Sequence, residues 1–294
     1  DRLYRCGDEI VAAGQFFHTG TPVVLWIDPQ GYDAYRCRRH FEPSEIMPRN
    51  PSAPDDPNRY NIRRILDEDL KDRIDKQGWT LENLQSVVDQ FVIHYDVCGT
   101  SCRCFEILQD IRGLSVHFML DVDGTIYQTL DLKERAWHAG TANDRSVGIE
   151  IAHIGAYPDM ETLNEWYALD DGGWPYITFP DWMTETGIRT PGFVGRAAHK
   201  KIIKGTINGR ELMQYDFTNE QYDALTKLTA ALARIFPQLK LDVPRDTQGN
   251  LRRDVLSRDE LEAYSGLLAH WHITKAKIDP GPAFDWDRVL GGAR

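Results

Sequence analysis

The sequence predicts an α/β fold in which a mixed central β-sheet is flanked by helices. Short apolar and β-branched runs, typical of buried strands, alternate along the chain with helix-like stretches. Two of these runs flank an Asp-Gly pair, which is typical of a hairpin turn. Strands interspersed among helices, with one hairpin among them, favour a mixed sheet that helices cover.

Five segments carry the strand pattern. The apolar run at residues 91–93 is short and rich in β-branched residues, and both features argue for a buried strand. The turn of the predicted hairpin comprises residues 121–124. The five segments are residues 22–27, 91–93, 116–120, 125–130 and 146–151.

Capping residues indicate where helices begin. Thr80 is an N-cap candidate for a helix ahead of the second strand. A capping box at residues 218–221 opens a long amphipathic helix that Pro237 closes. A second capping box at residues 257–260 starts a shorter helix, which we expect to lead directly to His270.

The chain divides into an extension and a main domain. Residues 1–64 are rich in proline and charge and include a probable loop at 48–54, so we expect an extension packed on the main domain of residues 65–294. The strand pattern weakens at about 155–216, which we interpret as an aromatic-rich insertion. Either the insertion is an added subdomain whose aromatic rings pack against the sheet, or part of it forms a wall of the substrate groove. Three tryptophans lie in it: Trp166, Trp174 and Trp182.

The composition excludes several classes of protein. The 294 residues, 41% of them hydrophobic, suffice to bury a large core, which excludes a disordered chain. With 34 basic and 45 acidic residues, the net charge of −11 argues against a nucleic-acid partner. No apolar run approaches the roughly 20 residues that cross a bilayer, so we expect no membrane span. The first residue is Asp1 rather than Met, which suggests a processed secretory precursor or a trimmed chain.

The five cysteines are too few for a disulfide scaffold, and their odd number leaves at least one thiol unpaired. Cys6 and Cys37 lie on either side of residues 22–27. Two of the three clustered cysteines, Cys98, Cys102 and Cys104, could also pair, which would fit an oxidising compartment. Reduced and partly buried thiols are the alternative.

Three residues form a candidate metal site. His94 follows a predicted strand, His270 follows a predicted helix, and Asp279 lies in a Lys-Ile-Asp-Pro-Gly segment. Two neutral imidazoles and a carboxylate suit Zn²⁺ and leave a fourth position open for water. Each residue alone carries little weight, because a single histidine after a strand is more often a hydrogen-bonded structural residue, and Asp-Pro-Gly is more often a plain turn.

Five motifs follow one another along the chain. They are Phe91–His94; Leu114–Phe118 with Asp123–Gln128; Arg135–Gly140; Asn143–Ile151; and Ala269–His270 with Lys277–Trp286. In this order they resemble the zinc-dependent N-acetylmuramoyl-L-alanine amidases of the type 2 family, which also contains the peptidoglycan recognition proteins. The resemblance runs from about residue 88 to 290, interrupted by the insertion, and implies the same mixed α/β fold.

The resemblance implies one Zn²⁺ per chain, bound by His94, His270 and Asp279. His272 lies two residues after His270, so a shift of register would make it the ligand instead. We prefer His270, because the family has a small residue before this ligand and Ala269 supplies it.

Two catalytic roles carry over by position. Glu150 matches the glutamate that ends the family's Gly-Ile-Glu strand and would take a proton from the attacking water. Lys277 matches a lysine that faces the scissile carbonyl and would stabilise the developing oxyanion. The alternatives are a salt bridge at the strand end for Glu150 and a solvated side chain for Lys277.

Four further residues are assigned to substrate binding. Trp137 and His138 match the loop that lines the family's substrate groove, where a ring can stack on a sugar and an imidazole can bond its N-acetyl group. A packed loop anchor is the alternative for both. Asn143 can hold this loop by side-chain-to-backbone bonds, and His117 can either support the site or merely pack.

The clustered cysteines allow two further interpretations. The spacing of Cys98 and Cys104 resembles the disulfide of the peptidoglycan recognition proteins, with Cys102 as a competing partner. A thiolate metal site that recruits His94 is disfavoured, because it would dismantle the open zinc site.

The function implied by the resemblance is hydrolysis of the amide bond between N-acetylmuramic acid and L-alanine in peptidoglycan or its fragments. The alternatives are a non-catalytic peptidoglycan-binding module and an amidase of the same fold that acts on another amide. We expect a monomer whose partner is peptidoglycan or a muropeptide. It would be periplasmic or secreted, with a cytoplasmic recycling role left open.

Overall fold

The computed structural model describes residues 5–36, 59–64 and 67–294. The loop expected at residues 48–54 and Cys37 lie outside these described residues. Within them, no helix is long and apolar enough to cross a membrane.

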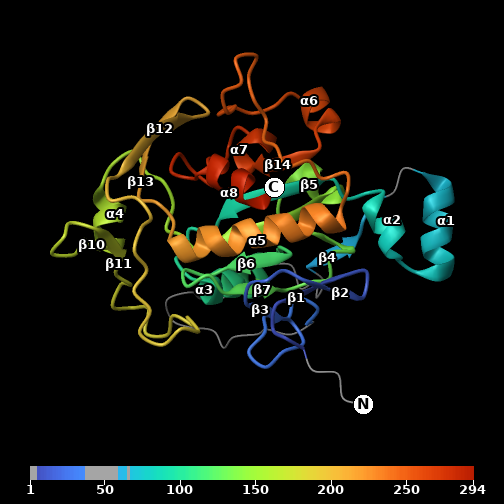
Figure 1. Ribbon diagram of the computed structural model, residues 1–294, viewed down its shortest axis with the longest axis horizontal. Helices are drawn as coiled ribbons and strands as arrows, with labels where there is room; N and C mark the ends of the chain where they lie inside the picture. The colour runs from blue at the N-terminus through green and yellow to red at the C-terminus, as the bar shows by residue number, and fades with distance from the viewer. Residues whose placement is uncertain (1–4, 37–58, 65–66) are drawn as a thin grey trace.

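A six-stranded mixed sheet forms the centre of the molecule (Figure 1). Only the β6–β7 pair is antiparallel, and the remaining neighbours are parallel. The predicted fold class is therefore confirmed. In spatial order the strands are β14 (Gly266–Ala269), β5 (Gln90–Tyr95), β9 (Ser146–Ile151), β6 (Phe118–Leu120), β7 (Ile126–Gln128) and β3 (Val23–Leu25).

The strand predictions fall into this sheet with one omission. The hairpin predicted around residues 121–124 is the β6–β7 pair, closed by hydrogen bonds from Asp121 N to Thr125 O and from Gly124 N to Asp121 O. Gly124 has a φ of +83°, which favours glycine at this turn. The prediction that a helix leads directly to His270 is wrong, because the four-residue strand β14 intervenes. It is too short for its periodicity to be recognised.

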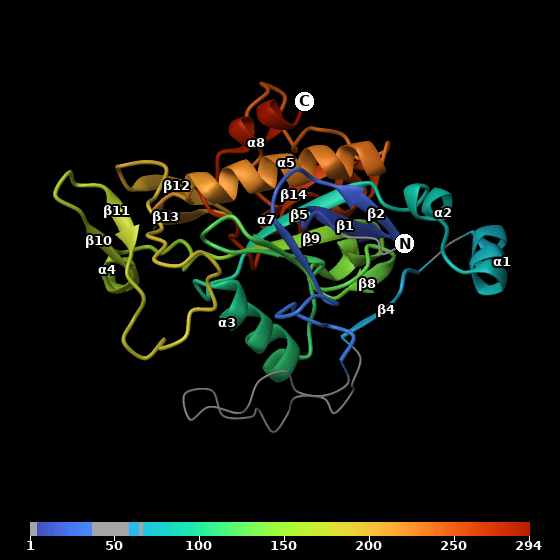
Figure 2. The same ribbon diagram turned by 60° about the horizontal axis from the view of Figure 1, so that its bottom comes forward.

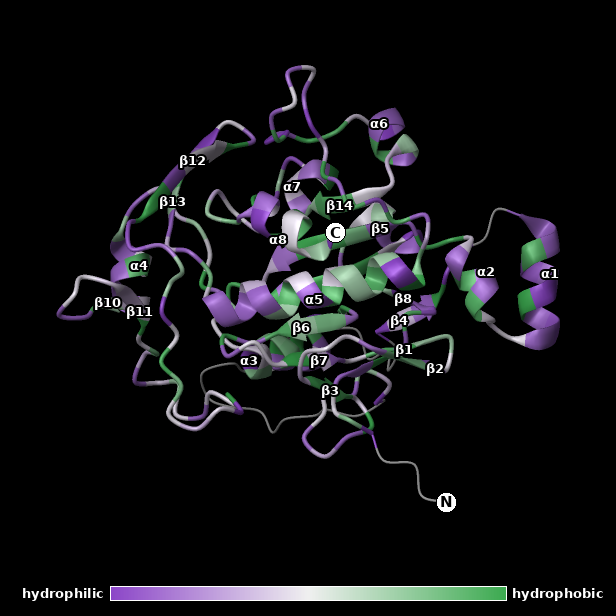
Figure 3. Ribbon diagram, viewed as in Figure 1, coloured by the Kyte–Doolittle hydropathy of each residue, from purple (hydrophilic) through white to green (hydrophobic). Residues whose placement is uncertain are grey.

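Helices cover both faces of the sheet. Figure 2 shows α5 (Asn219–Ile235) on one face and α3 (Ser101–Phe105), continued by a π-helix (Glu106–Arg112), on the other. The apolar side of α5 packs into the main core, and the central strands are correspondingly apolar in Figure 3. The predicted capping boxes are present at Thr218 and Ser257.

The remaining helices are short and surround this centre. These helices are α1 (Glu68–Gln77), α2 (Leu81–Gln85), a 3₁₀ turn (Gly140–Asp144), α4 (Glu161–Trp166), α6 (Arg258–Ala263), α7 (His270–Ile273) and α8 (Trp286–Ala293). Thr80 caps α2 as predicted.

The N-terminal segment joins the main sheet. Beyond the single predicted strand it also contains β1 (Glu9–Ala12) and β2 (Gln15–His18), which form a hairpin. The strand expected at 22–27 is β3, which pairs with β7. A fourth strand, β4 (Tyr60–Ile62), pairs with β8 (Glu134–Ala136).

Residues 155–216 form a lobe at the left of Figure 1. Its strands are β10 (Tyr167–Leu169), β11 (Pro175–Ile177), β12 (Ile203–Ile207) and β13 (Arg210–Gln214), in two hairpins. Trp166 is buried in the lobe's own apolar cluster, whereas Trp174 and Trp182 are 39% and 45% exposed. A Cβ at Gly99 would lie 2.3 Å from the Trp166 ring, so the lobe packs closely on the segment that leads into α3.

We expect Asp121→Asn to stabilise the protein increasingly as the pH rises. Asp121 is fully buried, and burial raises the pKa of its carboxyl to about 8 from an ordinary 3.8. The folded protein therefore binds this proton more tightly than the unfolded chain does, and stability falls as the pH rises between these values. Asparagine mimics the protonated acid, so the melting temperature of the variant minus that of the wild type should grow from about pH 5 to about pH 8.

The matched control is Asp75→Asn on the exposed side of α1, which should show no such growth. A melting difference for Asp121→Asn that stays constant with pH would contradict the expectation.

Candidate active site

Three neighbouring parallel strands bring the site together. His94 lies near the end of β5, Glu150 near the end of β9, and His270 directly after β14. His94 pairs with Glu150 in register, and Ala269 pairs with Ile93. The carboxyl ends of adjacent parallel strands share one edge of the sheet, so the three side chains converge there.

His94, His270 and Asp279 form a tight trio of potential ligands. The Nδ1 atoms of the two histidines and Oδ2 of Asp279 lie 2.9 Å from one another in all three pairings. All three residues are buried, with exposed fractions of 1%, 8% and 6%. Ligand atoms around a tetrahedral zinc ion lie about 3.3 Å apart, given bonds of about 2.0–2.1 Å. The donor set and its spacing therefore fit one such ion.

The protonation states of the trio suit a metal site. Burial, with help from His270, lowers the pKa of His94 to about 4, so the imidazole is neutral at physiological pH. Burial alone would raise the pKa of the Asp279 carboxyl, but His270 and His94 outweigh it and hold that pKa below its usual range. A neutral imidazole and an ionised carboxylate are the forms that bind cations.

His272, the alternative ligand, makes hydrogen bonds with both ring nitrogens outside the trio. Its Nδ1 accepts a hydrogen bond from Ala269 N at 3.0 Å, and its Nε2 donates to Arg252 O at 2.7 Å. Burial lowers its pKa to about 4, which keeps the ring neutral. The structure thus brings His270, and not His272, to the trio.

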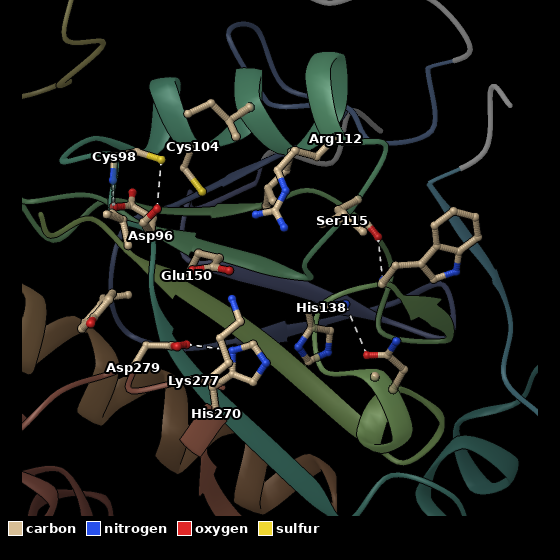
Figure 4. Close-up of a pocket in the computed structure, with 18 residues that line it drawn as sticks. Asp96, Cys98, Cys104, Arg112, Ser115, His138, Glu150, His270, Lys277 and Asp279 are labelled. Carbon is tan, nitrogen blue, oxygen red and sulfur yellow. Dashed lines mark hydrogen bonds and ion pairs between the residues drawn. The ribbon is translucent and has the colours of Figure 1, made fainter. Parts of the chain in front are cut away.

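Glu150 lies in the same pocket without a partner for one of its oxygens. Its Oε2 is buried and has no hydrogen-bond partner within the described part of the chain. Burial, followed by the charges of Asp279 and Asp96, raises the pKa of the Glu150 carboxyl well above its usual value. Figure 4 shows the Lys277 ammonium and the Arg112 guanidinium reaching toward it from opposite sides.

The loop residues that the sequence analysis selected line a second side of the pocket. Trp137, His138 and Asn143 all line it. Asn143 Oδ1 accepts hydrogen bonds from the backbone N–H groups of His138 at 3.2 Å and Ala139 at 2.6 Å. Asn143 therefore shapes the loop, as its side chain suggested.

His138 lines the pocket and contacts the trio through His94. Its Nδ1 lies 3.0 Å from His94 Nε2, and its Nε2 lies 3.3 Å from Ser146 Oγ. A His94 ring that coordinates through Nδ1 keeps its proton on Nε2 and donates it to His138, which fixes the orientation of the ligand. Gly148 leaves room for this ring, because a Cβ there would lie 2.4 Å from His138.

His117 lies behind the pocket rather than in it. It is fully buried and is not among the residues that line the pocket. Its Nδ1 accepts from Gly148 N at 3.2 Å and its Nε2 donates to Glu134 O at 2.9 Å. Its neutral ring ties β6 to β9 and β8, so it supports the site without reaching a substrate.

The opposite wall is formed by residues that the sequence analysis did not select. They come from the π-helix and the segment after it, and include Ile107, Leu108, Arg112 and Leu114, in a pocket of about 550 Å³. The sequence analysis did not predict this helix, because the segment that leads into it is rich in glycine, serine and cysteine. No residue of the 155–216 lobe lines this pocket, so the lobe does not wall it.

The implied disulfide is absent among the described cysteines. Cys6, Cys98, Cys102 and Cys104 are free thiols. The Cys98 thiol donates a hydrogen bond to Asp96 O at 2.9 Å, and its Sγ lies within 4.8 Å of the Cys104 Sγ, whereas Cys102 contacts Tyr32. Cys98 and Cys104 also line the pocket.

The protein-family model described as N-acetylmuramoyl-L-alanine amidase matches residues 84–282. The chain belongs to this amidase family. The resemblance in the five motifs and the prediction of an enzyme of this class are confirmed. No curated protein matches the chain.

Three solved structures are similar to this amidase at low sequence identity. AmpD is 17% identical, with 83% of this chain and 93% of that chain covered and a TM-score of 0.37. E. coli AmiD, in complex with anhydro-N-acetylmuramic acid-L-Ala-D-γ-Glu-L-Lys, is 18% identical, with 70% and 57% covered and a TM-score of 0.39. Drosophila PGRP-LB, in complex with tracheal cytotoxin, is 15% identical, with 67% and 77% covered and a TM-score of 0.30.

We expect His270→Ala to lose most of its bound metal and His272→Ala to keep it. Of these two histidines, only His270 contributes a nitrogen to the trio. Loss of His272 leaves the buried Ala269 N–H without this acceptor, at about 1–3 kcal/mol, and removes one of the two donors to the Arg252 carbonyl, so that variant should melt earlier. Elemental analysis and thermal melting of both variants provide the check. A metal-free His272→Ala would show that the register of the site is different.

Proposed function

We propose that this amidase is a zinc hydrolase that cleaves the bond between the lactyl group of N-acetylmuramic acid and L-alanine, in peptidoglycan or its fragments. The observation that carries the proposal is the trio of His94, His270 and Asp279, two of which line one pocket with Lys277 and with Glu150, whose buried Oε2 has no hydrogen-bond partner among the described residues. Membership of the family supports it.

The residues of the chain divide the reaction between them. His94, His270 and Asp279 would hold one zinc ion, which when bound polarises the scissile carbonyl and lowers the pKa of water. Glu150, with its raised pKa, accepts the proton of the attacking water and returns it to the leaving amine. The Lys277 ammonium stabilises the negative charge that develops on the carbonyl oxygen.

Recognition of the sugar and the stem peptide would use the two walls of the pocket. The Trp137 ring and the His138 imidazole offer a stacking face and a polar group on one side. The π-helix offers an apolar surface with Arg112 at its end, which is positively charged and therefore suited to a carboxylate of the peptide. We infer that a muropeptide, and not nucleic acid, fits this pocket, and that the protein acts as a monomer where peptidoglycan lies, in the periplasm or outside the cell.

A digest of defined muropeptides followed by mass spectrometry tests the proposal. With anhydro-N-acetylmuramic acid-L-Ala-D-γ-Glu-L-Lys as substrate, we expect the free sugar and a peptide that begins with L-alanine. Release of another fragment would indicate an amidase for a different amide. Binding without any product would indicate a recognition module, although all candidate ligands are present in this chain.

We expect Glu150→Gln to keep the metal and lose turnover by about 10²–10⁴-fold, because a general base acts on water and does not hold the ion. Gln preserves the shape of the side chain and removes only its ability to take a proton. Metal content and kcat are measured on the same preparation. Near-normal kcat in a folded, metal-loaded variant would remove Glu150 from the mechanism.

A further inference from the structure

A second cluster of potential ligands lies in the same pocket, apart from the trio. One carboxylate oxygen of Asp96 and the Sγ atoms of Cys98 and Cys104 all lie within 4.8 Å of one another. In Figure 4 they occupy the side of the pocket beside the helix, with Glu150 between them and the pair of Asp279 and His270. The cluster shares no residue with the trio.

The backbone orients one oxygen of Asp96 and leaves the other free. Oδ1 accepts hydrogen bonds from the N–H groups of Cys98 at 2.8 Å, Gly99 at 3.1 Å and His153 at 3.1 Å. These bonds hold the carboxyl rigidly just after β5. Its Oδ2 is buried and has no hydrogen-bond partner within the described residues. A buried acceptor that no N–H or O–H group contacts is costly unless a proton or a cation binds it, so this oxygen is available to a cation.

The two thiols lie near the Asp96 carboxylate on a preformed framework. Cys98 and Cys104 are 8% and 2% exposed. Thr100 caps α3, and the N–H of Cys104 donates to Thr100 O at 3.0 Å, so the first turn of α3 fixes the position of Cys104 relative to Cys98. The Cys98 thiol donates a hydrogen bond to Asp96 O at 2.9 Å, and the two Sγ atoms lie within 4.8 Å of each other.

We propose that Asp96, Cys98 and Cys104 bind a second divalent cation of the thiophilic, zinc-like class. Zinc–sulfur bonds of about 2.3 Å place two thiolates of a tetrahedral site about 3.8 Å apart, so small side-chain rotations suffice to form the site. The two thiols release their protons to solvent on binding, and Asp96 supplies the third ligand. All three residues line the pocket, from which water or substrate can complete the coordination.

Cobalt distinguishes this site from the His-His-Asp trio. Thiolate ligands give Co²⁺ an intense charge-transfer absorption in the near ultraviolet, and the trio contains no sulfur. The full chain is stripped with a chelator, kept in a phosphine reductant and titrated with Co²⁺. We expect two bound Co²⁺ per chain and a charge-transfer band that is lost in Cys98→Ser and in Cys104→Ser.

Two further variants make the assignment specific. Asp96→Asn keeps the Oδ1 acceptor and should weaken cobalt binding at the sulfur site at least tenfold. Cys102→Ser is the matched control, since its thiol lies on the same helix but contacts Tyr32, and it should leave the band unchanged. His270→Ala should lose the first cobalt and retain the band, so the outcome does not depend on the amidase reaction.

Three results would overturn the proposal. They are a reduced, folded protein that gives no charge-transfer band, a band that survives removal of both Cys98 and Cys104, and a Cys98–Cys104 disulfide in the protein as isolated without reductant. Differential alkylation and mass spectrometry detect the disulfide directly. Circular dichroism shows whether each variant is folded. If a serine variant does not fold, the cobalt affinity of Asp96→Asn tests the site instead.

Discussion

The parallel pairing of β14, β5 and β9 is the constraint on which the site depends. Residues 94, 150 and 270 are far apart in the sequence, and this pairing alone places them at one edge of the sheet. A slip of one residue in β5 would turn His94 to the opposite face, because successive side chains of a strand alternate. The buried apolar residues that hold the strands under α5 therefore also fix the relative positions of these three residues.

Three carboxyl groups lie close together in the pocket. Those of Asp279, Glu150 and Asp96 line it, and those of Glu150 and Asp96 each keep one buried oxygen without a hydrogen bond among the described residues. The charged form of such a group is expensive to bury, so burial raises the pKa of the Glu150 and Asp96 carboxyls. Cations offset this cost, and Lys277 and Arg112 face Glu150 in the pocket.

The residues that both the sequence analysis and the structure place at the candidate site are those whose position follows from a strong local pattern. His94 and Glu150 end strands that carry clear apolar runs, and motif order singled out His270 and Asp279. The π-helix wall with Arg112 was missed because π-helical segments have no simple periodicity to recognise. His117 was grouped with the substrate-binding residues because a sequence does not show whether a residue just before a short strand faces the pocket. The thiol pair was visible as a cluster, but its proximity to the Asp96 carboxylate depends on the turn after β5.

The N-terminal segment also contributes to the site, through a buried charge. Arg63 follows β4, is 1% exposed, and donates to the carbonyls of Asn143 at 3.2 Å, Asp144 at 3.1 Å and Leu132 at 2.9 Å. Burial lowers the pKa of its guanidinium to about 9, so it is still charged at neutral pH. Leaving such acceptors unpaired costs about 1–3 kcal/mol each, so Arg63 locks the loop in which Asn143 holds the backbone of His138. Because His138 in turn orients His94, the N-terminal segment acts on the ligand geometry through a chain of direct contacts.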